Sequence, residues 1–189
     1  MRGWKTKIFV AALALCAPAI ASAGWQDVAT TFDQSRLARL EESRAKAMSE
    51  VGDIPAAREA LDAPASGRSV AGSYRCRTIK LGGMARAVVY SWFHCRVRAY
   101  AGGLVFEKVS GSQRMAGRLY ADGDGYVYLG ASWVKGEPPH RYSGNGASVG
   151  AHATPDDQIG RLTATSYGAR IEFPYPLQES TFDIIEMRR

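Results

Sequence analysis

The C-terminal two thirds of the chain consist of short runs in which apolar and polar residues alternate, separated by glycine-rich steps. Alternation with a period of two places successive side chains on opposite faces of a β-strand. The glycines between the runs favour the positive φ of tight turns. The pattern predicts eight strands, over residues 70–80, 87–99, 104–110, 112–121, 126–134, 158–166, 169–175 and 181–187.

The strands follow one another with no helix between most of them, which indicates an antiparallel meander. Closing the meander into a barrel removes the unpaired edges, so we predict a mainly β fold with a small calycin-like barrel. A two-sheet β-sandwich is the alternative. The calycin analogy depends on Gly72-Ser73-Tyr74 in the first strand and Arg188-Arg189 after the last. It concerns the fold and says little about function.

Residues 1–23 have the pattern of a secretory signal peptide. A basic start precedes an apolar run from Ile8 to Ile20, and Ala21-Ser22-Ala23 gives a cleavage pattern. We therefore expect a periplasmic or secreted protein that begins at Gly24. Cys16 suggests a lipoprotein as the alternative, but Leu15 precedes it where a small residue is expected. The apolar run is short for a membrane span, and we expect none in the mature chain.

Residues 24–63 are expected to form an N-terminal helical segment, and residues 64–189 the β-barrel domain. Leu37, Leu40, Met48 and Val51 recur near a 3.6-residue period, with Asp33 as the predicted N-cap. Gly52 is expected to end this helix, and Pro55 to begin a second, short one. Because the apolar stripe is thin, these one or two helices are expected to lie against the barrel or to be loosely attached.

Removal of the signal peptide leaves two cysteines, Cys76 and Cys95, which we expect to form one disulfide in an oxidising compartment. The closed loop of about 20 residues contributes on the order of 3 kcal/mol. If the two cysteines face each other directly, the hairpin midpoint falls near Ala85 and Arg86. The obvious turn residues are instead Gly82-Gly83, so either the loop is broad or the cysteines meet in another way.

Alternation places the cysteines with the apolar set and collects a cationic and aromatic set on the opposite face. The candidate binding residues there are Arg75, Arg77, Trp92, His94 and Arg96. The alternative is a solvated outer surface, or a dock for the acidic N-terminal helices. Residues 25–62 hold eight acidic and five basic residues, whereas residues 64–189 hold sixteen basic and ten acidic ones. This balance lacks the dense basic stripe of a nucleic-acid partner, and we expect none.

The segment from Lys135 to Asp157 is rich in glycine and proline and is predicted to be a loop. Loops on rigid scaffolds often carry function, so its polar residues are candidates for lining a mouth of the barrel. They are His140, Arg141, Tyr142 and His152. The alternative is a surface excursion with no role in binding.

No catalytic motif is present: the chain lacks a Gly-x-Ser-x-Gly elbow, a His-Glu-x-x-His pair and a phosphate-binding loop. We assign no catalytic residue and expect no metal and no cofactor, since the histidines are scattered and the cysteines lack zinc spacing. Carboxylates near the last two strands leave a carboxylate-based hydrolase or lyase as an alternative, and they are Glu172, Glu179, Asp183 and Glu186.

Several stretches resemble, in the same order, a family of exported proteobacterial proteins catalogued as domain of unknown function 4893. They include Gly72–Gly83, Trp92–Val97, Lys108–Arg114, Gly117–Tyr120, Leu129–Ala131 and Pro174–Glu186. The resemblance covers most of residues 25–187. It implies export and a single domain, and it transfers no activity.

The leading hypothesis is a non-enzymatic periplasmic binding module for a small molecule, a peptide or another envelope protein. Besides the carboxylate enzyme, a structural or inhibitory envelope protein that acts through its surface is a further alternative. A hollow barrel interior favours the small ligand, and a packed one favours a surface interaction.

Overall fold

The computed structural model describes residues 24–144 and 154–189. The predicted signal peptide and His152 lie outside the described residues. None of the helices within the described part is long and apolar enough to cross a membrane.

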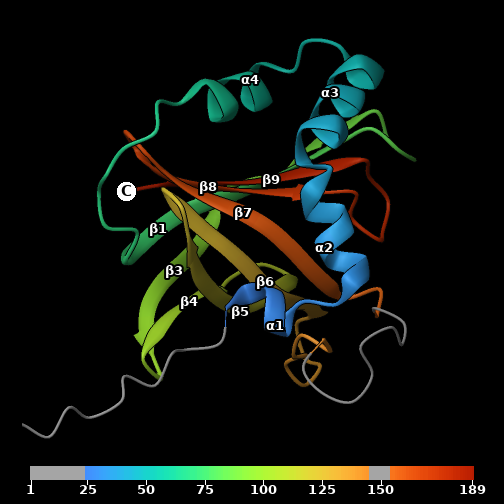
Figure 1. Cartoon of the computed structure of the whole chain (residues 1–189). Helices are drawn as coiled ribbons and strands as arrows, with labels where there is room; N and C mark the ends of the chain where they lie inside the picture. The colour runs from blue at the N-terminus through green and yellow to red at the C-terminus, as the bar shows by residue number, and fades with distance from the viewer. Residues whose placement is uncertain (1–23, 145–153) are drawn as a thin grey trace, which may run out of the picture.

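The described residues form a closed antiparallel barrel of eight strands with one additional strand (Figure 1). Neighbours along the sheet are also neighbours in sequence except at β2, which pairs with β1 alone, and pairing of β1 with β9 closes the barrel. The predicted meander and barrel are confirmed. The strands are β1 (Gly72–Leu81), β2 (Ala87–Val89), β3 (Phe93–Tyr100), β4 (Gly103–Lys108), β5 (Gln113–Asp122), β6 (Gly125–Val134), β7 (Asp157–Thr165), β8 (Gly168–Pro174) and β9 (Phe182–Arg188).

The strand predicted over 87–99 is two strands, because a bulge interrupts it at residues 90–92. Ile79 pairs with Val89, and Cys76 pairs with Phe93, so two residues of β1 face three residues of the second chain segment. One extra residue on one side of an antiparallel pair is the definition of a β-bulge. The bulge lets β2 continue past the end of the β3 pairing and project as a hairpin with the end of β1.

Cys76 and Cys95 form the predicted disulfide, with 5.8 Å between their Cα atoms. They are not directly opposite, because Cys95 pairs with Tyr74 in the ladder. The loop after β1 spans residues 82–86 and is closed by a hydrogen bond from the Gly82 amide to the Arg86 carbonyl (2.9 Å). The diagonal disulfide and the broad loop together explain the displaced hairpin midpoint.

One end of the barrel interior is packed with aromatic and aliphatic side chains. The Tyr128 ring meets Phe106 and Phe173 edge-to-face, at centroid distances of 5.8 and 5.7 Å. Gly117 and Gly130 lie against that ring, and a Cβ at either position would collide with it and with the backbone of the paired strand. The two glycines therefore make room for the largest side chain of the interior.

Four helices precede the barrel: α1 (Trp25–Val28), α2 (Thr31–Ala38), α3 (Leu40–Val51) and α4 (Pro55–Asp62). Gly52, with φ of 74°, ends α3, and Pro55 begins α4, as predicted. The prediction of Asp33 as an N-cap is wrong. Thr30 is the N-cap, and its Oγ1 accepts a hydrogen bond from the Asp33 amide.

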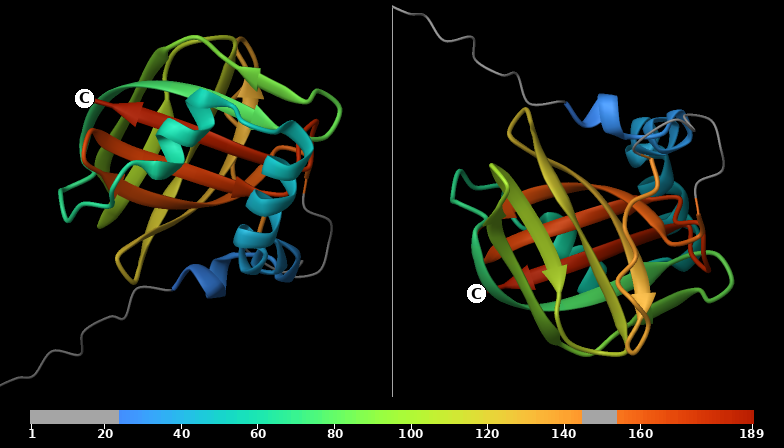
Figure 2. Two further views of the ribbon diagram at one scale, coloured as in Figure 1. Left: turned by 90° about the horizontal axis from the view of Figure 1, so that it is seen from above. Right: turned by 90° about the horizontal axis from the view of Figure 1, so that it is seen from below.

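The helices cover the outer face of the barrel in two places (Figure 2). The α3–α4 pair packs on β1 and β9, where small helix residues allow close approach to the apolar side chains of the strands. This buried cluster is Ala47, Val51, Ala57, Ala60, Ile79, Leu81, Phe182 and Ile184. A second cluster joins the α1–α2 region to β6 and β7 and consists of Ala29, Val127, Leu129 and Ile159. The helical segment is packed against the barrel, not loosely attached.

Candidate functional site

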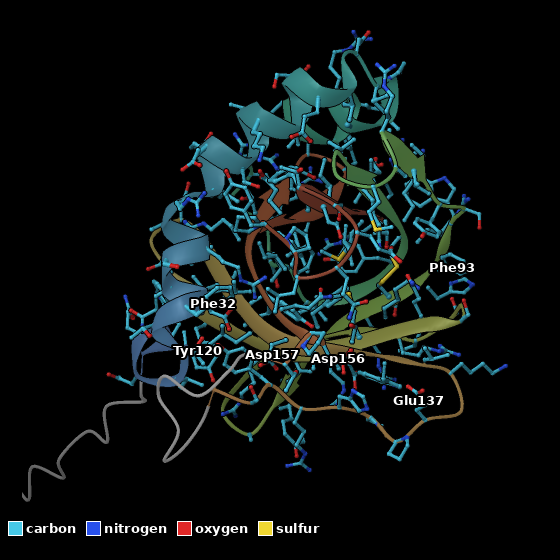
Figure 3. The ribbon with its side chains drawn as sticks, turned by 90° about the vertical axis from the view of Figure 1, so that its right-hand side faces the viewer. Phe32, Phe93, Tyr120, Glu137, Asp156 and Asp157 are labelled. Carbon is cyan, nitrogen blue, oxygen red and sulfur yellow. A yellow bond between two sulfur atoms is a disulfide. The ribbon has the colours of Figure 1, made fainter. Side chains whose placement is uncertain are left out.

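The connections β1–β2, β4–β5, β6–β7 and β8–β9 meet at one end of the barrel, which we call the mouth. Figure 3 looks toward this end, with Asp156 and Asp157 close together at the edge of the ring of strands and Glu137 further out. A cavity of about 340 Å³ lies here between side chains of the strands, the long loop and α2. The interior is therefore packed at one end and hollow at the other.

The inward side chains become more polar along the barrel axis toward the mouth. On β1, Tyr74 and Cys76 belong to the packed core, while Thr78 and Lys80 line the cavity. On β9, Met187 belongs to the core and Asp183 lines the cavity. The apolar floor is formed by Met115, Phe173 and Ile185, and the polar walls by Thr78, Lys80, Lys108, Ser132, Gln158 and Asp183.

Asp183 is an inward carboxyl without a basic partner within ion-pair distance among the described residues. Its Oδ1 accepts a hydrogen bond from Ser180 Oγ (2.6 Å). Lys80, its direct cross-strand neighbour, instead pairs with Glu179 (2.7 Å). Burial raises the pKa of Asp183 to about 7, so this carboxyl changes charge near neutral pH.

Lys108 is the second titratable group of the cavity. Its Nζ donates to the carbonyls of Gln113 (2.6 Å) and Ser110 (3.3 Å) and lies 4.4 Å from the centroid of the Phe93 ring. Burial, with a smaller effect of the nearby Arg114, lowers the pKa of Lys108 to about 8. Shifted pKa values in a concave pocket are typical of functional sites.

A buried polar network from α2 forms the back wall of the cavity. Arg36 Nε donates to Asp33 Oδ1 (3.0 Å), and the same guanidinium donates to the carbonyls of Tyr175 and Asp157. The Asp157 carboxylate accepts hydrogen bonds from the amides of Ser143 and Thr154. This network fixes the long loop and the β8–β9 connection to α2, so the wall of the cavity is held in place by fully partnered groups.

A family model described as a domain of unknown function, DUF4893, matches residues 25–187. The chain belongs to this family. The match confirms the resemblance seen in the sequence and spans both the helices and the barrel. Comparison with curated proteins and with solved structures found no match.

In this DUF4893 barrel the candidate residues of the cationic face lie outside, away from the cavity. The Trp92 ring is surrounded by the guanidinium groups of Arg75 (5.4 Å), Arg77 (4.6 Å) and Arg188 (5.5 Å). Glu59 of α4 pairs with Arg188 (2.6 Å) and, at 3.7 Å, with Arg77. This part of the cationic face is thus a dock for an acidic N-terminal helix, one of the alternatives drawn from the sequence.

The remaining residues of the cationic face are partnered locally. Arg96 and Arg98 both pair with Glu107, at 2.5 and 2.9 Å. His94 is exposed on the same face, and its amide donates to Ser110 Oγ (2.7 Å). None of these side chains lines the cavity.

The three loop candidates have three different positions. His140 lines the cavity, and its Nδ1 lies 2.9 Å from Asp156 Oδ2. Arg141 is exposed to solvent. Tyr142 points away from the cavity toward α2, where its hydroxyl donates to Asp33 Oδ2 and burial, followed by that hydrogen bond, raises its pKa. Tyr142 therefore anchors the loop.

The C-terminal carboxylates do not form a catalytic pair. Glu172 faces outward and binds both Arg44 and Arg170, and Glu186 faces outward between Arg77 and Arg188. Only Asp183 lines the cavity. In the described part of the chain, no three histidine, cysteine or carboxylate side chains are grouped as a metal site.

The sequence analysis missed Lys80, Lys108 and Arg36 as residues of the cavity. The available signal was their position: Lys80 and Lys108 occupy inward places in alternating strands, and Arg36 falls on the buried stripe of a helix. A charged residue at a core position is unusual enough to be marked as a candidate.

Proposed function

We propose that the protein is a non-enzymatic binding module of the periplasm or the extracellular space, and that it holds a small molecule in the mouth of its barrel. The observation that carries the proposal is the cavity of about 340 Å³, with an apolar floor beneath polar and charged walls. Small-molecule sites are concave and mostly apolar, with a few convergent polar groups that orient the ligand.

The size of the cavity indicates the size of the ligand. Pockets that hold small molecules span roughly 300–1,000 Å³, and this one lies at the lower end of that range. The proposal therefore concerns a compact ligand and not a long lipid or a folded peptide.

Two observations support export. The Cys76–Cys95 disulfide suits an oxidising compartment. The first 23 residues have the basic, apolar and small-residue pattern of a signal peptide. Free-thiol counting on protein taken from the periplasm tests the first of these directly.

Filling the cavity tests the binding proposal. Ser132 lines the cavity, so Ser132→Trp places an indole where the ligand is proposed to bind, and Ser132→Ala is the matched control that leaves the space open. A fragment library is screened against all three proteins by ligand-observed NMR. We expect hits for wild type and Ser132→Ala that Ser132→Trp loses, with all three proteins showing the same near-ultraviolet circular dichroism. Hits that survive in Ser132→Trp would place binding elsewhere.

A second candidate function is acid–base catalysis in the same cavity, as a hydrolase or lyase. It is favoured by Asp183 and Lys108, whose pKa values of about 7 and 8 allow both to exchange protons near neutral pH. A panel of ester, glycoside and phosphoester substrates is the test. Turnover that Asp183→Asn abolishes would support catalysis over simple binding.

A further inference from the structure

Most charged side chains that line the cavity have a partner of opposite charge. Arg36 pairs with Asp33, Lys80 with Glu179, and His140 with Asp156. Asp157 accepts several hydrogen bonds from Ser143 and Thr154, and Glu137 lies exposed on the loop, where it accepts from the Val134 amide. These groups are already satisfied or lie in solvent.

Positive charge is left over on the β4–β5 side of the cavity. Lys108 Nζ has only two carbonyl partners, and no carboxylate of the described residues lies within ion-pair distance of it. Arg114, next to it, has neither a hydrogen bond nor an ion pair with another described side chain. Glu107, the acidic residue of this hairpin, is occupied by Arg96 and Arg98.

Negative charge is left over on β9. Asp183 accepts a hydrogen bond from a neutral hydroxyl, that of Ser180, while Glu179 takes the charge of the adjacent Lys80. The two lysine–glutamate charges cancel, so the carboxyl of Asp183 is the charge in excess on this side.

The two excess charges lie on opposite sides of the mouth. Around the barrel, β9 and β5 are separated by β1, β3 and β4 in one direction and by β8, β7 and β6 in the other. In a closed barrel of eight strands, this makes them diametrically opposite. The apolar floor of Met115, Phe173 and Ile185 lies between them.

We propose, on the basis of the function proposed above, that the ligand is a small zwitterion of the amino-carboxylate class. Its ammonium pairs with Asp183, its carboxylate pairs with Lys108 and Arg114, and its apolar middle covers the floor of the cavity. Charge-assisted hydrogen bonds in a poorly solvated pocket are stronger than those between neutral groups, so both ends contribute to the affinity.

Three probes with the same six-carbon chain separate the two charges: 6-aminohexanoate carries both, hexanoate only the anion, and hexylamine only the cation. Binding to the full mature protein is measured by isothermal titration calorimetry at pH 7.5 and low salt. We expect 6-aminohexanoate to bind at least about tenfold more tightly than either monofunctional probe, because each added ion pair is worth roughly a factor of ten. A series of ω-amino acids of four to eight carbons then has one preferred length.

Two variants assign the ends. Asp183→Asn should remove the advantage of 6-aminohexanoate over hexanoate, and Lys108→Met its advantage over hexylamine. Arg118→Met is the charge-matched control, because Arg118 is exposed on β5 and bonds to the Ala101 carbonyl away from the cavity. Circular dichroism and melting temperature establish that each variant is folded.

Equal affinity for the three probes, binding unaffected by both variants, or no binding of any probe up to about 10 mM overturns the zwitterion inference. The function proposed above is judged separately, by the fragment screen with Ser132→Trp. Fragments that bind only when the cavity is open, together with no preference for the zwitterion, leave the binding module intact and reject this ligand class.

Discussion

Two buried tyrosines of the barrel interior differ in whether their hydroxyl has a partner. The Tyr74 hydroxyl donates to the Val70 carbonyl (2.6 Å), whereas the Tyr128 hydroxyl is buried without a partner among the described residues. A buried hydroxyl without a hydrogen bond costs about 1–3 kcal/mol. We expect Tyr128→Phe to raise the free energy of unfolding by about 1 kcal/mol and Tyr74→Phe to lower it by a similar amount, measured by urea denaturation. A loss of stability in both variants would contradict this account.

Asp183 links the stability of the fold to pH. Its pKa is raised to about 7 by burial, with Lys80 opposing the shift and Glu179 adding to it. The unfolded chain has an ordinary aspartate pKa near 4, so between about pH 4 and 7 the folded state binds more protons than the unfolded one. Stability contributed by this proton is therefore present at low pH and is lost as pH rises through 7.

The test is Asp183→Asn, which removes the titrating group. We expect the difference in free energy of unfolding between variant and wild type to move in favour of the variant as pH increases from 5 to 7.5. Asp53→Asn, at an exposed position on the surface, is the control. A difference that stays constant across this range would show that Asp183 is not buried as described.

At the scale of elements, helix α3 is fixed to β8 by an ion pair whose acidic partner is buried. Arg44 binds two carboxylates, Glu172 with 2% of its side chain exposed and Glu41 with 77% exposed. Removing one partner of a buried pair costs about 3 kcal/mol or more, whereas exposed pairs contribute less than about 1 kcal/mol. We expect Glu172→Ala to be strongly destabilising and Glu41→Ala nearly neutral in urea denaturation. Equal effects would show that the helix is held by its apolar contacts alone.

The disulfide joins β1 to β3 beside the bulge. It closes a loop across 19 residues of sequence, which corresponds to a contribution of about 3 kcal/mol. The double variant Cys76→Ala and Cys95→Ala should therefore melt at a lower temperature while keeping the barrel. Two reactive thiols in unfolded wild-type protein that was never exposed to reductant would refute the bond itself.

The elements were predictable from the sequence wherever one residue type decides the local structure. Glycine and proline positions gave the ends of most strands and of α3 and α4, because these residues restrict the backbone directly. The bulge at residues 90–92 was not predictable, since it arises from how two strands pair and not from the residues of either strand. The capping role assigned to Asp33 failed for a similar reason: Thr30 is an equally good cap, and the burial of Asp33 beside Arg36 depends on the folded barrel.

The candidate site shows the same limit. Arginines and aromatic residues beside the cysteines drew attention to the outer face, where distant partners such as Glu59 and Glu186 neutralise them. Those partners are far away in sequence, so the charge looked unpaired. Lys108 and Asp183 were visible only as single charges in alternating strands. Their shared cavity is a property of barrel closure.

At the scale of the whole molecule, the barrel has a packed half and a hollow half, and this division predicts where it opens. Backbone amides are protected most where many apolar side chains are buried, and regions near a binding site are drawn from the less stable end of the range. We expect the slowest hydrogen exchange around Phe106, Leu119, Tyr128 and Ile171, which belong to the packed cluster. Amides near Gln113 and Val134 should exchange faster and should slow when a cavity ligand binds. Uniform protection along the strands would mean that the mouth is as rigid as the core, and the cavity would then be preformed to the same degree as the rest of the barrel.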